Sequence, residues 1–180
     1  MEAEEVSKET EGLFVFARQY AEMKLRDEER REQLLLSQSV NMQSAFSIMI
    51  VAIFMLLPII IEHRGDLSLE AILSGCSIVV GLLLMSLLFA SSAQNRQLYD
   101  SLGDVDSFYK EIMTNYELYL NPAQQNKALV EAIIEIQTKR CQINNLRVKR
   151  IRRSMTFFYL ALAVILLCFI ASVVFIAIDH

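Results

Sequence analysis

Residues 41–61 read NMQSAFSIMIVAIFMLLPIII and contain no charged side chain. Two further stretches share this property: residues 71–94, AILSGCSIVVGLLLMSLLFASSAQ, and residues 154–178, SMTFFYLALAVILLCFIASVVFIAI. Each is longer than the roughly 20 residues that a helix needs to cross about 30 Å of hydrocarbon. Lipid offers the backbone no hydrogen-bond partner, so a spanning segment of this kind must be helical. The sequence therefore predicts an all-α integral membrane protein with three transmembrane helices.

The connection between the first two stretches, residues 62–70, has room only for a tight turn. Gly65 and Asp66 are residues that favour turns, and Ser68 can cap the helix that follows. We therefore expect residues 41–94 to form a transmembrane hairpin of two antiparallel neighbouring helices.

Lys and Arg residues gather on one side of the predicted membrane. The first stretch is preceded by Lys24, Arg26, Arg30 and Arg31, and the third by Lys139, Arg140, Arg147, Lys149, Arg150, Arg152 and Arg153. The hairpin connection carries only Arg64, and the last two residues carry none. Because Lys and Arg concentrate in cytoplasmic loops, this pattern predicts an inner (plasma) membrane protein with its N-terminus in the cytoplasm and its C-terminus outside.

The chain divides into four predicted segments. Residues 1–40 form a cytoplasmic N-terminal amphipathic helix, residues 41–94 the transmembrane hairpin, residues 95–153 cytoplasmic helices, and residues 154–180 the third transmembrane helix. The first 11 residues carry five glutamates and lack the basic start of a cleavable signal peptide. We therefore expect the hairpin to remain in the mature protein.

Both cytoplasmic segments show helical periodicity. In the first, Leu13, Phe16, Tyr20 and Met23 recur at steps of three and four. In the second, one face would carry Val105, Phe108, Ile112, Tyr116 and Tyr119. Pro122 suits the first position of a helix, and neither Gly nor Pro follows it up to residue 178. The near-heptad stripe of this last helix, Leu129, Ile133, Ile136, Ile143 and Leu146, is interrupted by Arg140 and fits packing within one subunit or between subunits.

The sequence offers no catalytic constellation, and we expect no enzyme, no cofactor and no metal. The two histidines, His63 and His180, have no accompanying carboxylate or cysteine pattern. Phosphate-binding loops, CxxC pairs and nucleophile elbows do not occur. Cys76 and Cys168 lie in apolar stretches, where cysteine is usually a small packing residue. The spans also lack internal charged residues, which disfavours active transport.

Weakly polar and small residues in the hairpin are the candidates for a pore lining or for close helix packing: Ser44, Ser47, Ser74, Ser77, Gly81 and Ser86. Packing is the favoured interpretation for the i,i+4 pair Ser77 and Gly81, because small residues let helices approach. The basic run before the third span supplies candidate headgroup or topology anchors: Arg147, Lys149, Arg150, Arg152 and Arg153. No stacking platform accompanies this run, so we expect no nucleic-acid partner.

The order of these parts resembles the bacterial SLATT proteins, two-transmembrane effectors associated with nucleotide-signalling and SLOG systems in anti-phage defence. The likeness covers residues 10–120. It is carried by KLRDEERREQLLL (24–36), by the hairpin, and by SAQNRQLYDSLGDVDSFYKEI (92–112), where Arg96, Tyr99, Leu102 and Tyr109 are similar in pattern. The third span is additional to the two-span layout. The resemblance implies a pore-forming or membrane-disrupting effector that stays inactive until a partner or signal triggers it.

From these observations we expect a homo-oligomeric membrane effector whose partners are the lipid bilayer, its own copies and a soluble signalling protein. The alternative is a non-conducting scaffold or regulatory subunit that recruits a soluble partner through its cytoplasmic helices.

Overall fold

The computed structural model describes residues 2–63, 65, 68–94, 110, 113–114 and 122–178. Three helices account for almost all of them: α1 (Glu2–Glu62), α2 (Leu69–Gln94) and α4 (Pro122–Ile178). The described part of the chain contains no strand, so the protein is all-helical as predicted. The aromatic face expected at positions 105–119 lies outside the described residues.

Local chemistry explains where the helices end. Gly65 adopts a φ of 56°, a left-handed conformation that suits glycine in the turn after α1. Ser68 caps α2, because its Oγ accepts a hydrogen bond from the backbone N–H of Ala71 at 3.3 Å. Pro122 begins α4, where its missing N–H costs nothing. The turn, the cap and the proline start are confirmed.

All three helices are long and apolar enough to cross a membrane. Few residues of their most hydrophobic windows are buried within the chain, so most of these apolar side chains point outward. Water would oppose such a surface, whereas hydrocarbon accepts it. Helix α1 continues without interruption through Ser39 and Pro58, and α4 continues through residue 153, so two of the predicted segment boundaries fall inside continuous helices.

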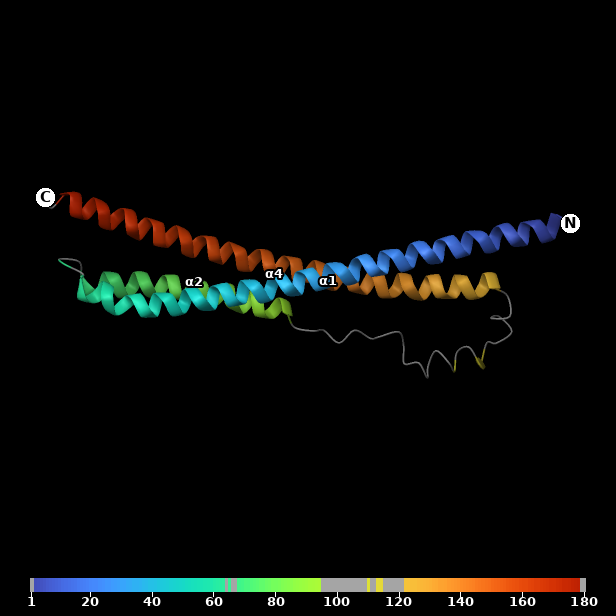
Figure 1. The fold of residues 1–180 in the computed structure, drawn as a ribbon, viewed down its shortest axis with the longest axis horizontal. Coiled ribbons are helices and arrows are strands. Elements are labelled where there is room, and N and C mark those ends of the chain that lie inside the picture. Colours follow the sequence, from blue (N-terminus) through green and yellow to red (C-terminus); the bar gives the residue numbers. More distant parts are fainter. Residues whose placement is uncertain are drawn as a thin grey trace. The chain divides into compact units, whose positions relative to one another are not determined.

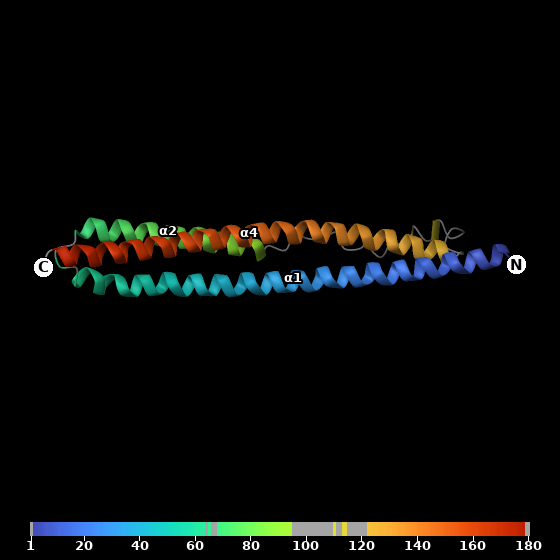
Figure 2. The same ribbon diagram turned by 90° about the horizontal axis from the view of Figure 1, so that it is seen from above.

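The chain forms two compact units, and each is described by itself. The first comprises Met1–Leu34 and Arg96–Asn145, and the second comprises Leu35–Asn95 and Leu146–His180. In the second unit, α2 packs against the C-terminal parts of α1 and α4 (Figures 1 and 2).

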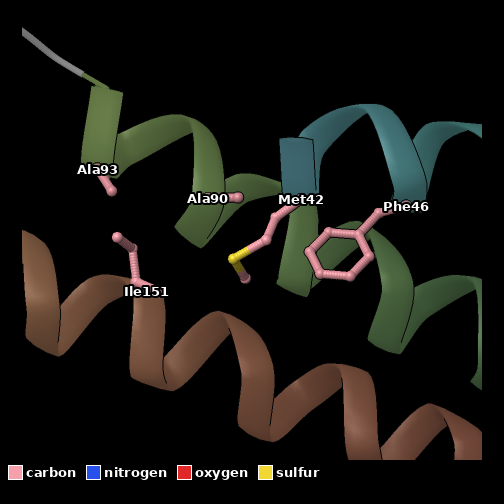
Figure 3. Close-up of a cluster of buried hydrophobic side chains, with 5 residues drawn as sticks. All are labelled: Met42, Phe46, Ala90, Ala93 and Ile151. Carbon is pink, nitrogen blue, oxygen red and sulfur yellow. The ribbon is translucent and has the colours of Figure 1, made fainter. Parts of the chain in front are cut away.

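Small side chains allow the three helices of the second unit to meet. Figure 3 shows one cluster, formed by Met42 and Phe46 of α1, Ala90 and Ala93 of α2, and Ile151 of α4. Both alanines are fully buried. A larger side chain at either position would hold the helices apart. Dispersion contacts of this kind are a main source of helix association in lipid, where the hydrophobic effect between helices is absent.

A second cluster lies nearer the hairpin turn and comprises Val79, Leu83 and Ala161. Aromatic contacts support both clusters: the rings of Phe46 and Phe158 lie 5.1 Å apart, and those of Phe89 and Phe157 stack at 5.4 Å. Toward its C-terminal end, α4 diverges from the other two helices of this unit (Figure 1), although the thiol of Cys168 still lies near Gly75 of α2, and residues 165–171 are all exposed.

The first unit brings the N-terminal parts of α1 and α4 together through polar contacts. Arg140 forms an ion pair with Glu29 at 2.7 Å between Nη1 and Oε1. The amide of Asn144 donates to Glu28 twice, to the carboxylate at 2.9 Å and to the backbone carbonyl at 3.1 Å. Arg140, which interrupts the apolar stripe in the sequence, therefore belongs to the contact between the two helices.

Candidate functional site

Helix α2 has two chemically different faces. One face is buried in the second unit and consists of Val79, Leu83, Ser86, Ala90 and Ala93. With 100° of rotation per residue, the opposite face carries Ser74, Ser77 and Gly81 at steps of three and four. The small and hydroxyl residues predicted for this helix are therefore divided between the two faces.

The outward face of α2 is uncovered in the described structure. Ser74 and Ser77 are exposed, and a Cβ added at Gly81 would meet nothing within 4 Å. The hydroxyl of Ser74 donates to the carbonyl of Ala71 in its own helix at 3.0 Å. This face continues along the helix as Leu84 and Leu88, both exposed. The face thus carries hydroxyl groups at its hairpin end and leucines farther along.

Ser44 and Ser47 of α1 are exposed as well. They lie away from the packed face of that helix, which Met42 and Phe46 define. Five of the six predicted pore or packing residues thus lie outside the packed core, and whether they line a pore or pack between subunits stays a prediction.

Ser86 is the exception among these candidates, because it is fully buried against Ser154 of α4. Its hydroxyl donates to the carbonyl of Ser154 at 2.8 Å, and the hydroxyl of Ser154 donates to the carbonyl of Ser86 at 2.7 Å. Nearby, the hydroxyl of Ser39 in α1 donates to the carbonyl of Ala90. Ser86 therefore joins helices within the chain, and the sequence analysis did not identify Ser39 or Ser154.

The basic run of α4 is also divided by burial. Arg147 is only 1% exposed and has an interaction partner within the chain. Arg150 donates from Nη1 to the carbonyl of Ser92 at 2.6 Å, near the C-terminal end of α2, where helix carbonyls lack partners of their own. Lys149, Arg152 and Arg153 are exposed. Headgroup anchoring stays a prediction, and these three residues are the ones accessible for it.

The described residues include no group of three or more His, Cys, Asp or Glu side chains that could hold a metal ion. His63 is exposed, and its Nδ1 lies 3.1 Å from the carbonyl of Ile59 one turn earlier. Cys76, Cys141 and Cys168 are free thiols.

Comparisons with protein-family models, curated proteins and solved structures returned no match.

Proposed function

We propose that this protein is a homo-oligomeric membrane effector in which the outward face of α2 contacts neighbouring copies and forms or gates a pore. The observation that supports this most is the outward series on a helix apolar enough to span a membrane: Ser74 and Ser77 are exposed, and a Cβ added at Gly81 would meet nothing within 4 Å. Nothing in the described part of the chain packs against this series.

The physical argument compares lipid with protein as the neighbour of this face. Leucine side chains can face hydrocarbon without loss, whereas a hydroxyl group gains nothing from it. Small residues also allow a second helix to approach closely, and hydroxyl groups can bond across such a contact. A ring of copies would place the same hydroxyls around an axis, where they could line a path for water or ions.

The absence of charged residues inside the three spans favours passive conduction over active transport. The resemblance to SLATT proteins adds a biological setting, a bacterial defence effector released by a signal. In this proposal the first unit holds the resting state, because Arg140 and Asn144 join α4 to Glu29 and Glu28 of α1. A soluble signalling partner would act by changing these contacts.

The proposed orientation places the N-terminus and residues 95–153 in the cytoplasm of a bacterial cell, as the distribution of Lys and Arg favours. Cys141 provides a native reporter in a variant in which Cys76 and Cys168 are replaced by Ser. A membrane-impermeant maleimide should label Cys141 in inverted vesicles and leave it unlabelled in intact cells. Labelling in intact cells would contradict the orientation without bearing on the pore.

The pore proposal is tested by mass and flux together. The purified protein should be a multiple of the subunit mass in mild detergent and should release a trapped fluorescent dye from liposomes. Ser77→Leu should reduce both oligomer and flux, whereas Ala163→Leu, at an exposed site on α4, should reduce neither. Ser47→Leu makes the same change on α1. Comparing its flux with that of Ser77→Leu shows whether α1 or α2 faces the path. A monomer without flux from well-folded protein would refute the proposal.

One observation favours the alternative, a scaffold that recruits a soluble partner. Leu13 and Phe16 in the first unit are 70% and 69% exposed, and Tyr20 and Met23 continue the same face. An apolar face of this kind outside the membrane is typical of a binding surface. The scaffold predicts one stoichiometric partner in a pull-down, lost in Phe16→Asp, from a protein that conducts nothing in liposomes.

A further inference from the structure

The second unit contains an apolar cavity where α4 separates from the hairpin. Its volume is about 670 Å³, within the range of roughly 300–1,000 Å³ that ligand pockets show. Ile53 and Ile60 of α1, Gly75 and Val79 of α2, and Ile165 and Phe169 of α4 contribute to its walls. All of its walls belong to helices that are long and apolar enough to cross a membrane.

Neither water nor empty space fits this cavity. Water needs two to four polar partners in a buried site, and the few polar atoms here belong to the helices' own hydrogen bonding. The hydroxyl of Ser172, for example, donates to the carbonyl of Cys168 at 2.9 Å. Left empty, the cavity would cost its walls the dispersion contacts that a neighbour supplies.

We propose that the cavity is a binding site for an acyl chain of a membrane lipid. Because the walls lie in spanning helices, the surrounding solvent is itself hydrocarbon and can enter where α4 leaves the hairpin. A lipid chain needs no donors or acceptors, which matches walls built from aliphatic and aromatic side chains. It is also flexible enough to fill an irregular space.

A helix from a second copy is the rival occupant, but the chemistry of the walls favours the lipid. Helix contacts in membranes use small residues and interhelical hydrogen bonds. The cavity walls mix large side chains such as Leu56 and Phe169 with small ones such as Gly75, and the hydroxyl of Ser172 bonds within its own helix, so the walls offer no hydroxyl bond to a second helix. The bilayer also supplies acyl chains at high concentration, without the entropy cost of bringing two proteins together.

The inference can be tested with a phosphatidylcholine that carries a diazirine at the end of one acyl chain. The protein is reconstituted with this lipid, extracted in mild detergent, washed free of bulk lipid and then irradiated. Mass spectrometry should place the label within residues 165–172 of α4 and 71–79 of α2. The unchanged protein is used, so this mapping does not depend on any variant folding.

Ala171 and Ala163 form a matched pair on α4, because both are exposed in the subunit but only Ala171 lines the cavity. Ala171→Phe fills the site and should lower labelling by about tenfold, while Ala163→Phe should keep it within about twofold. Circular dichroism and the elution profile verify that both variants keep their helices.

Three results would overturn the inference. The label could be absent after washing, which would mean that α4 closes onto the hairpin. It could be spread over outward residues such as Leu84 and Leu88, which would mean that no site is preferred. Cross-links between two chains through the cavity walls would assign the site to a second copy. None of these results depends on conduction, so the lipid site and the proposed pore can fail separately.

Discussion

Replacing Ser86 by Leu and replacing Ser77 by Leu are the same chemical change on the same helix, yet their effects should be opposite. Ser86 is fully buried between α2 and α4, whereas Ser77 is exposed on the outward face. The comparison therefore tests which face of α2 packs within the subunit.

The expected magnitude follows from the contacts of Ser86. Ser86→Ala removes the hydroxyl that donates to the carbonyl of Ser154 and lies 3.1 Å from the hydroxyl of Ser154. An interhelical hydrogen bond in a membrane is worth on average about 0.6 kcal/mol and at most about 1.7 kcal/mol. The carbonyl of Ser154 loses this donor but keeps its hydrogen bond within α4, so no group is left without a partner. Ser86→Leu adds overpacking, which typically costs about 1–3 kcal/mol. The sum is a loss of about 1.6–4.7 kcal/mol.

Ser77→Leu should leave the free energy of unfolding of the monomer unchanged or raise it slightly, because Leu transfers into the bilayer with a gain of up to about 0.6 kcal/mol. Unfolding is measured by titration with SDS in mixed micelles, followed by energy transfer between dyes on α2 and α4. Ser86→Ala with Ser154→Ala completes a double-mutant cycle for the reciprocal bonds. Equal stability of the two Leu variants would refute this packing arrangement.

Three other substitutions test separate contacts. Asn144→Ala removes the bonds to Glu28 and should destabilise the first unit by about 1.5–3 kcal/mol, seen as faster hydrogen exchange in residues 122–145. Arg150→Met leaves the carbonyl of Ser92 without its charged donor and should cost about 1–3 kcal/mol in the SDS titration, whereas the exposed Arg152→Met should stay within about 0.5 kcal/mol. Gly65→Ala forces a side chain into a left-handed turn and should cost about 1–2 kcal/mol in the same titration.

The transmembrane helices could be predicted from sequence because hydrocarbon imposes a simple requirement. A segment must be apolar over about 20 residues, and three segments meet this rule. The turn at Gly65 and the cap at Ser68 follow from local backbone chemistry, which a short stretch of sequence contains in full. These features depend on neighbours along the chain, not on the fold.

Which face of each helix points inward was harder to predict, although residue spacing in the sequence contains part of this information. Ser77 and Ser86 are nine residues apart, which is about half a turn in direction at 100° per residue. They therefore cannot share a face of α2. Which of the two points inward depends on Ser154, a residue far away in the chain.

The basic run illustrates a different difficulty. Its neighbour Leu146 belongs to the predicted near-heptad stripe, for which packing within one subunit or between subunits was left open, and it is 45% exposed, whereas Arg147 is buried. The spacing of Ile151 and Ser154, four and seven residues later, places position 147 on the inward face. Helical periodicity therefore decides that Arg147 is buried. The helix cannot rotate position 147 outward without also rotating the buried Ile151 and Ser154 outward.

The uncovered faces of this chain carry different information inside and outside the lipid. Leu84 and Leu88 need no explanation, because hydrocarbon is a sufficient neighbour for them. Ser77 does need an explanation, since a serine that faces lipid lacks the favourable free energy of transfer into the bilayer that Leu would have at the same position. For Phe16 in the first unit the argument is reversed, because water penalises an exposed ring and a protein partner relieves the penalty. The polar residue facing lipid and the apolar residue facing water are therefore the two places where this subunit most needs a neighbour.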